Sequence, residues 1–143
     1  MLVSTKGRYA LRVMVDLAEH NNGEYIPLKE IADRQNISEK YLESIISILS
    51  KAHFLDGLRG KGGGYRLIKQ PEQYTAGSIL KLTEGSLAPV SCLADKKLNC
   101  GRAASCKTLP MWQKLDTLID NFLENVTIAD LLQNQAAPND YSI

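Results

Sequence analysis

Residues 38–66 have the sequence SEKYLESIISILSKAHFLDGLRGKGGGYR, which predicts a capped helix followed by a glycine-rich hairpin. Ser38 suits the N-cap position, because its hydroxyl can accept a hydrogen bond from a backbone N–H of the first turn. Apolar side chains then recur at helical spacing, at Leu42, Ile45, Ile46 and Leu49. We therefore expect a helix from Ser38 to about Ala52 with one apolar and one polar face.

Two short β-prone runs follow, at residues 54–58 and 65–68. The loop between them, Arg59-Gly60-Lys61-Gly62-Gly63-Gly64, is basic and almost free of side-chain bulk. This pattern predicts an antiparallel hairpin with a slim basic tip.

Upstream, apolar residues at helical spacing predict a helix over residues 9–18 that ends at 20–23, and a short second helix from Pro27 to 34–36. A short helix, a tight turn, a capped longer helix and a hairpin form the order of a winged helix-turn-helix. We therefore predict a mainly α fold with a small β-hairpin wing.

Downstream, a short helix is expected over residues 75–82, closed by Glu84-Gly85. Residues 86–106 show no regular period. A long amphipathic helix is predicted from Pro110 to Val126, and Thr127 suits the cap of a last helical turn. The polar tail 135–143 is expected to be frayed.

The predicted winged unit suits double-stranded DNA, because a helix fits the major groove and a slim basic loop can enter the minor groove. Arg59 is the candidate for minor-groove insertion, where negative potential is concentrated. Lys61 and Arg66 are expected to contact phosphates, and Gly60 and Gly62 to allow close approach of the backbone. On the helix, the polar face includes Glu39, Lys40 and Glu43.

Two other interpretations of these elements exist. The helix pair could be a plain helical hairpin with a solvated face, and the glycine loop a flexible turn. A nucleotide-binding P-loop is excluded, because Gly60-Lys61-Gly62 is not followed by Ser or Thr.

Charge is unevenly distributed in this chain of 143 residues and net charge +1. Residues 1–70 contain eleven Lys or Arg and eight Asp or Glu, whereas residues 71–143 contain six and eight. The first half is therefore the better candidate for a polyanion partner. The sequence has no apolar run of membrane-spanning length and no leader pattern, so we expect a cytoplasmic protein without a membrane partner.

All three cysteines, Cys92, Cys100 and Cys106, fall in the aperiodic segment. Thiolates select zinc, copper(I) or iron-sulfur clusters, and the missing C-x-x-C pairs make zinc the weaker choice. Possible fourth ligands in the segment are Asp95, Ser105 and Thr108. Unligated thiols and a redox disulfide are the alternatives.

The predicted long helix has a wide apolar stripe, which a chain of this size cannot easily bury alone. Packing against a second copy across a two-fold axis would cover it, and the alternative is packing on the first helix. The candidate dimer interface comprises Trp112, Leu115, Leu118, Ile119 and Phe122.

Nothing in the sequence predicts an enzyme. His20 and His53 are isolated, and Asp116 and Asp120 are helical neighbours on a polar face.

Several motifs resemble the bacterial IscR/NsrR/CymR family of regulators. They are Ser4-Thr5-Lys6-Gly7-Arg8-Tyr9-Ala10, Ile37-Ser38 with Tyr41-Leu42-Glu43, the wing Arg59-Gly60-x-Gly62-Gly63-Gly64-Tyr65, and the cysteine segment followed by Trp112. The resemblance covers nearly the whole chain. It implies a homodimeric winged-helix transcription factor in which Ser38, Tyr41 and Glu43 lie at the major groove and the long helices cross to form the dimer. We expect this transcription factor to be a repressor.

The same resemblance implies that Cys92, Cys100 and Cys106 hold a 2Fe-2S or 4Fe-4S cluster that reports iron-sulfur, redox or nitrosative status. At this site the sequence differs from the family pattern in two ways. The interval between Cys92 and Cys100 is longer than in the IscR and NsrR branches, and Leu109 stands where the IscR branch has a histidine ligand. Residues 75–77 and 84–90 resemble the CymR branch instead. That branch implies a cluster-free regulator of cysteine metabolism that acts through thiol oxidation or a partner enzyme.

Four parts are expected along the chain: a DNA-binding domain over 1–84, a sensor loop over 85–108, a dimerisation helix with a short terminal helix over 109–134, and the flexible tail.

Overall fold

The computed structural model describes residues 3–95 and 100–134. The expected tail, residues 135–143, lies outside the described residues. The elements are α1 (Thr5–Glu19), α2 (Leu28–Gln35), α3 (Glu39–Lys51), β1 (Leu55–Leu58), β2 (Gly64–Leu67), the 3-10 turn η1 (Pro71–Gln73), α4 (Ala76–Glu84), the 3-10 turn η2 (Ser91–Leu93), α5 (Leu109–Glu124) and α6 (Ile128–Gln133). The mainly α fold with one small hairpin is therefore confirmed, and most element ends fall within a few residues of their expected positions.

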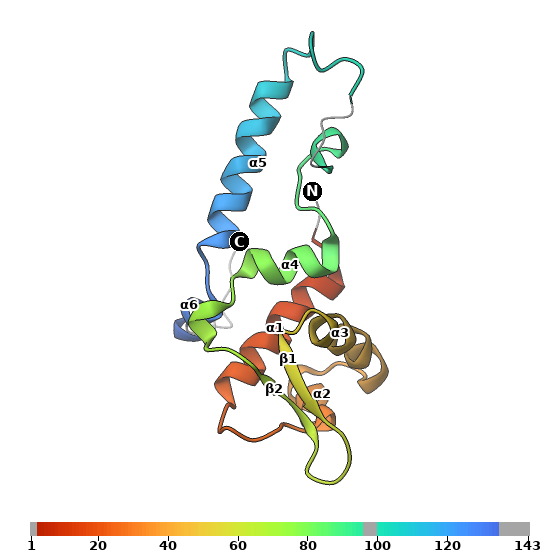
Figure 1. Ribbon diagram of the computed structural model, residues 1–143, viewed down its shortest axis with the longest axis vertical. Coiled ribbons are helices and arrows are strands. Elements are labelled where there is room, and N and C mark those ends of the chain that lie inside the picture. The colour runs from red at the N-terminus through yellow and green to blue at the C-terminus, as the bar shows by residue number, and fades with distance from the viewer. Residues whose placement is uncertain (1–2, 96–99, 135–143) are drawn as a thin grey trace, which may run out of the picture.

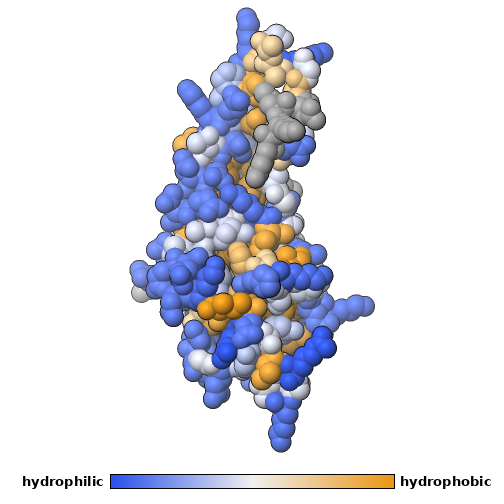
Figure 2. Space-filling model, in the orientation of Figure 1, coloured by the Kyte–Doolittle hydropathy of each residue, from blue (hydrophilic) through white to orange (hydrophobic). Residues whose placement is uncertain are grey.

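Helices α1, α2, α3 and the β1–β2 hairpin form a lower body, from which α5 rises as an arm (Figure 1). Helix α4 lies between them, and the segment with η2 lies beside the arm. On the face shown in Figure 2, apolar patches appear both along this arm and across the lower body, between polar side chains.

The core of the lower body is aliphatic, as the periodicity predicts. Helix α1 contributes Ala10, Val13, Met14 and Leu17, and α3 contributes Leu42, Ile45, Ile46 and Leu49, all of them buried. Burial of this apolar surface fixes which face each helix turns inward and so leaves the polar face of α3 on the outside.

The turn between α2 and α3 is set by local backbone chemistry. Asn36 ends α2 in the left-handed conformation at φ 53°, which asparagine tolerates better than most residues. The Ser38 hydroxyl then accepts a hydrogen bond of 3.1 Å from the backbone N–H of Tyr41. The predicted N-cap of α3 is therefore confirmed.

A buried carboxylate fixes α2 on α1. Asp16 is 1% exposed and accepts hydrogen bonds from the guanidinium of Arg34 at 2.8 and 3.0 Å and from the amide of Gln35 at 2.8 Å. These hydrogen bonds satisfy both oxygens of Asp16, as a buried charge requires.

An ion pair connects α4 to α5. The ammonium of Lys81 lies 2.6 Å from Asp120 and 2.9 Å from Glu124. Glu124 also accepts a hydrogen bond of 3.0 Å from the hydroxyl of Thr75, the N-cap of α4. Asp120 thus takes part in a partly exposed ion pair between α4 and α5.

Candidate nucleic-acid interface

The outer face of α3 is polar and open to solvent. Ser38, Glu39, Lys40 and Glu43 are exposed, and Tyr41 is half-buried. The Tyr41 ring meets the edge of Tyr9 with centroids 5.9 Å apart, and the guanidinium of Arg12 lies 4.8 Å from the centre of the Tyr9 ring. These two α1 residues, whose support for Tyr41 was not predicted from the sequence, fix its place at the start of α3.

The hairpin pairs Leu55 with Leu67 and Leu58 with Gly64 in antiparallel register. Its loop is closed by a hydrogen bond of 3.0 Å from the N–H of Gly63 to the carbonyl of Gly60. Gly60 and Gly62 have φ of 90° and 77°, which glycine adopts without strain. The tip is therefore a narrow backbone turn with little side-chain bulk.

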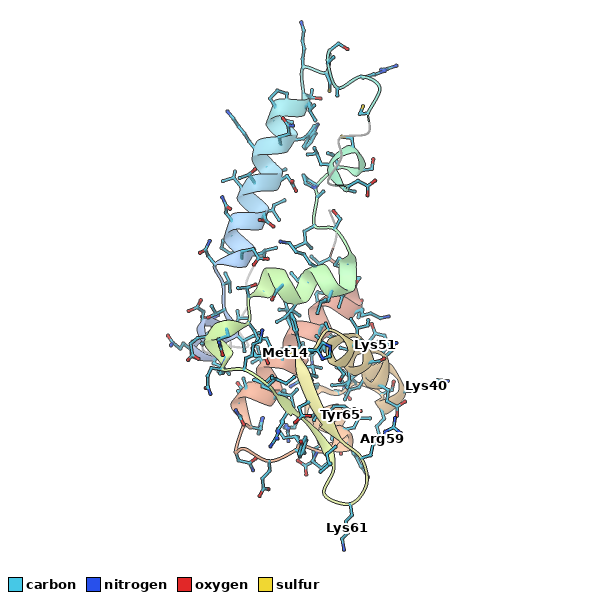
Figure 3. The ribbon with its side chains drawn as sticks, viewed as in Figure 1. Met14, Lys40, Lys51, Arg59, Lys61 and Tyr65 are labelled. Atoms are coloured by element: carbon cyan, nitrogen blue, oxygen red, sulfur yellow. The ribbon has the colours of Figure 1, made fainter. Side chains whose placement is uncertain are left out.

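Arg59 and Lys61 are the free cations of this loop. Both are exposed, and neither forms a side-chain hydrogen bond or ion pair with any residue in the described ranges. In Figure 3, Lys40 and Arg59 lie on the same side of the molecule, and Lys61 projects from the tip of the hairpin. The structure thus brings basic groups of α3 and the wing to one end of the lower body.

Arg66, the third basic residue of the predicted wing contact, is engaged within the protein. Its guanidinium lies 3.2 Å from a carboxylate oxygen of Asp56, donates a hydrogen bond of 2.8 Å to the carbonyl of Gly23, and stacks 4.2 Å from the centre of the Tyr25 ring. The hydroxyl of Tyr25 donates to the same Asp56 oxygen at 2.7 Å. These contacts occupy the guanidinium, whereas Arg59 and Lys61 have no such partner among the described residues.

The electrostatics of this cluster follow from its contacts. The hydrogen bond from Tyr25, reinforced by Arg66, holds the pKa of Asp56 below its ordinary value of 3.8. The same hydrogen bond to Asp56 raises the pKa of Tyr25 above 10.0. Asp56 is thus an anion and Tyr25 a neutral hydrogen-bond donor at neutral pH.

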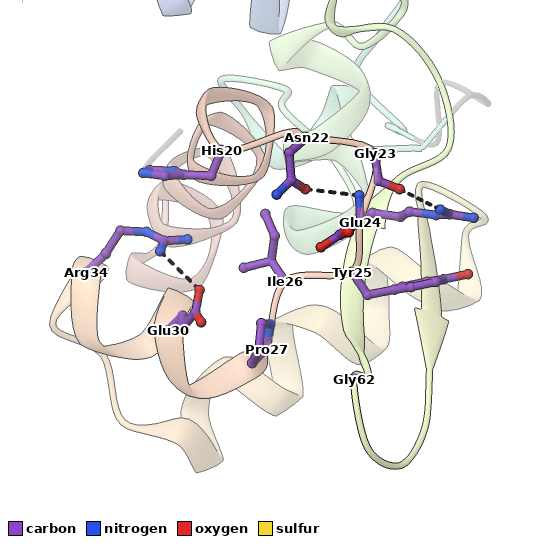
Figure 4. Close-up of a pocket in the computed structure, with 11 residues that line it drawn as sticks. His20, Asn22, Gly23, Glu24, Tyr25, Ile26, Pro27, Glu30, Arg34 and Gly62 are labelled. Atoms are coloured by element: carbon purple, nitrogen blue, oxygen red, sulfur yellow. Dashed lines mark hydrogen bonds and ion pairs between the residues drawn. The ribbon is translucent and has the colours of Figure 1, made fainter.

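A cavity of about 780 Å³ opens beside this cluster, between the α1–α2 connection, α2 and the wing (Figure 4). Its lining comprises His20, Asn22, Gly23, Glu24, Tyr25, Ile26, Pro27, Glu30, Arg34, Gly62 and Arg66. Two of its cations are already paired, because Arg34 lies 3.6 Å from Glu30 in addition to its bonds with Asp16, and Arg66 is paired with Asp56.

The three cysteines lie on the connection between α4 and α5. Cys92 is in η2, Cys100 opens a turn, and Cys106 precedes α5; all three are free thiols of intermediate exposure. Within residues 3–95 and 100–134, no group of three or more His, Cys, Asp or Glu side chains is placed to hold a metal ion. The donor chemistry fits a thiolate-bound cluster, but the loop does not assemble the three thiols into one site.

Cys106 has a distinct environment at the start of α5. Its sulfur lies 3.4 Å from the hydroxyl of Thr108. That contact, with the backbone N–H groups of Thr108 and Leu109, lowers the pKa of the Cys106 thiol. Leu109, which by the resemblance replaces the histidine ligand of the IscR branch, is buried.

The stripe on α5 is only partly covered. Trp112 and Ile119 are half-buried, whereas Leu115, Leu118 and Phe122 are exposed by 38%, 66% and 68%. Exposed large apolar side chains in a row are typical of an interaction surface.

An exposed recognition helix beside a glycine-rich basic wing defines a winged helix-turn-helix protein of the DNA-binding class. The model of the Rrf2 family, described as iron-dependent transcriptional regulator, matches residues 3–134. The chain therefore belongs to the Rrf2 family.

Individual relatives agree with this assignment. The HTH-type transcriptional regulator IscR of Sodalis glossinidius (strain morsitans) is 36% identical over 135 residues, which cover 94% of this chain and 81% of that protein. Among solved structures, CymR of B. subtilis superimposes with a TM-score of 0.75 at 33% identity, covering 92% of this chain and 96% of that one. IscR of T. potens gives a TM-score of 0.73 at 37% identity, covering 93% and 87%.

Because these relatives are named transcriptional regulators, the chain is a regulator and not an enzyme. In the part of the chain that the structure describes, no helix is both long and apolar enough to span a lipid bilayer.

Proposed function

We propose that this chain is a homodimeric repressor that binds paired half-sites in double-stranded DNA. Residues 1–84 form the DNA-binding domain, 85–108 the sensor loop and 109–134 the dimerisation region. The major-groove contacts come from Ser38, Glu39, Lys40, Tyr41 and Glu43. The wing contacts come from Arg59 at the minor groove, Lys61 at a phosphate, and the backbone at Gly60 and Gly62.

The observation that carries this proposal is the pair of free cations on the wing, beside the open polar face of α3. Cations that a protein does not pair internally attract phosphates and the narrow minor groove. The proposal assigns Arg66 no DNA contact, because its guanidinium is held by Asp56, Tyr25 and Gly23.

The test uses a duplex selected from a random-sequence pool by the unaltered protein. Arg59→Ala should weaken binding of this duplex by about 1–3 kcal/mol if the side chain reads the minor groove. Lys69→Ala is the matched control, because Lys69 is an exposed cation at the opposite end of the hairpin. Equal affinities for Arg59→Ala and the unaltered protein would remove the wing from the interface.

The repressor assignment has its own test. Transcription in vitro from a promoter that contains the selected duplex should fall when the unaltered protein is added. Stimulated transcription would contradict it.

We propose further that Cys92, Cys100 and Cys106 bind an iron-sulfur cluster of the 2Fe-2S or 4Fe-4S type, which makes DNA binding responsive to iron-sulfur, redox or nitrosative status. Three free thiols on one loop support this proposal, as do the family's description as iron-dependent and the IscR relatives. Soft thiolate donors suit such clusters. The loop must close to bring the three sulfurs together.

Anaerobic visible absorption with iron and sulfide analysis tests the cluster. Thiolate-to-iron absorption bands with matching iron and sulfide are expected from the unaltered protein, and none from a variant with Ser at all three cysteine positions. A colourless, iron-free protein after reconstitution would refute the proposal.

The second candidate is a cluster-free regulator of sulfur metabolism that acts through thiol oxidation or a partner enzyme. Two observations favour it: the thiols are not assembled in the described structure, and the chain superimposes on CymR, the global cysteine regulator of B. subtilis. DNA binding that responds to oxidant, without iron, and loses this response in the triple Ser variant would select it.

A further inference from the structure

The wing is joined to the rest of the domain by more than its own two strands. The backbone of Ile26, in the α1–α2 connection, exchanges two hydrogen bonds of 2.9 Å with Tyr65 of β2. Gly64 permits this approach, because a Cβ at that position would collide with the backbone of Ile26. The connection thus pairs with the hairpin along the open edge of β2.

Three side chains extend this junction on the same side. Tyr25 comes from the connection, Asp56 from β1 and Arg66 from β2, and they converge through the 2.7 Å Tyr25–Asp56 hydrogen bond and the 3.2 Å Arg66–Asp56 ion pair. Figure 4 shows the Tyr25 side chain extending from the connection across the hairpin. The guanidinium of Arg66 closes the cluster by donating 2.8 Å back to the carbonyl of Gly23 in the connection.

We propose that Tyr25, Asp56 and Arg66 form a brace that fixes the wing at the angle from which Arg59 and Lys61 reach DNA, and that all three are positioning residues. The inference rests on the wing contact proposed above. A two-stranded hairpin alone is marginally stable in water and pays the ordering cost of its tip when it binds. The brace removes part of that cost, because it ties both strands to the connection before DNA arrives.

Arginine is specific for this task. Its planar guanidinium stacks on the Tyr25 ring while it donates to Asp56 and Gly23, which a lysine ammonium cannot reproduce. A phosphate contact, by contrast, tolerates a lysine, since it needs mainly a positive charge at the right place. The substitution Arg66→Lys therefore separates the two roles.

The experiment is a double-mutant cycle on the full-length protein, with the duplex selected by the unaltered protein as probe. Tyr25→Phe, which removes one oxygen atom, and Arg66→Lys are each measured in the unaltered background and in the Arg59→Ala/Lys61→Gln background. In the unaltered background each should weaken binding about tenfold, in line with the loss of a hydrogen bond to a charged group. In the second background each should cost less than about twofold, because a wing without its cations gains nothing from correct placement.

A second measurement reports on the wing itself. Hydrogen exchange at the amides of residues 59–63 should accelerate in Tyr25→Phe, while the buried helix α3 keeps the protection of the unaltered protein. Unchanged exchange at the tip would overturn the brace.

Other outcomes overturn the proposal in distinguishable ways. Equal losses in both backgrounds would show that Tyr25 or Arg66 contacts DNA directly, and full affinity of Arg66→Lys would show that the stacked guanidinium is not needed to place the wing. If Arg59→Ala/Lys61→Gln binds as tightly as the unaltered protein, the wing contact itself fails. If that variant is weakened while Tyr25→Phe is not, the wing contact stands and the brace alone is refuted.

Discussion

The exposed stripe on α5 yields a quantitative prediction for Leu118→Asp. Leu118 is 66% exposed in the single chain. Complete burial of a leucine side chain contributes about 1.5–3 kcal/mol, so burial of the exposed two-thirds contributes about 1–2 kcal/mol in each protomer. In a two-fold dimer the position occurs twice, which gives about 2–4 kcal/mol in total. An aspartate at this position adds a further cost, because its carboxylate must either lose its hydration in the interface or hold the two helices apart.

The dissociation constant of the dimer should therefore rise roughly 30- to 700-fold. Sedimentation velocity over a protein concentration series measures this change. Gln113→Asp is the control, because it adds the same charge at an exposed position outside the apolar stripe, about 140° around the helix from Leu118. If Leu118→Asp dimerises at the same concentrations as the unaltered protein, the stripe is not the dimer interface and the reasoning from its exposure is wrong.

Further predictions concern the contacts that hold the domain together. Asp16→Ala removes the hydrogen bonds that Arg34 and Gln35 donate to a buried carboxylate and should lower the free energy of unfolding by about 2–3 kcal/mol, measured by urea denaturation. Lys81→Met breaks a partly exposed ion pair and should cost only about 1 kcal/mol in the same assay, so a larger loss would contradict a surface role. Gly64 has a φ of 151° and lies against the Ile26 backbone, so Gly64→Ala should lower the free energy of unfolding by more than about 1 kcal/mol. It should also abolish slow hydrogen exchange of the Tyr65 amide, and full protection of that amide would refute the close approach. Because its pKa in the folded protein is lowered, Asp56 should contribute to wing order above its ordinary pKa of 3.8, and this contribution should disappear as the pH falls through the folded value. The NMR signals of the Tyr25 ring should change over this pH range, and signals that stay constant through acid would contradict the prediction.

The elements that the sequence predicts well are those defined by neighbours in the chain. Ser38 caps α3 and Thr127 caps α6, and each hydroxyl accepts a hydrogen bond from the backbone N–H three residues on. The apolar period of α3 likewise identifies its buried face. Such features depend on residues within one or two turns, so spacing alone reveals them.

Contacts between distant segments could not be predicted in this way. Arg66 looks like a free wing cation in the sequence, yet its partners Tyr25 and Asp56 are 41 and 10 residues away and share no spacing rule with it. The link between Asp16 and Arg34 is of the same kind. Only the fold determines which charges are neutralised internally and which remain for a ligand.

The cysteine loop marks a different limit. Its three thiols share a segment with no periodic pattern. The spacing of the cysteines shows which ligands are available, but it does not show whether the fold brings the three sulfur atoms together. The structure leaves them apart within the described residues, so binding of a cluster would have to supply the free energy of closing the loop.

Closure of the cysteine loop would affect DNA binding through helix α4. Near its C-terminal end, Lys81 pairs with Asp120 and Glu124 of α5, and one turn later Glu84 accepts hydrogen bonds from the backbone and hydroxyl of Ser4, the N-cap of α1. The cysteine loop leaves directly from this turn and returns at the start of α5. A change in the loop would therefore act on the helix that contacts both α5 and α1, and α1 packs against α3. In the proposed dimer two wings must match two half-sites, so even a small rotation of α5 on α4 would alter their separation, and by this route a signal at the thiols would reach the DNA without a direct contact.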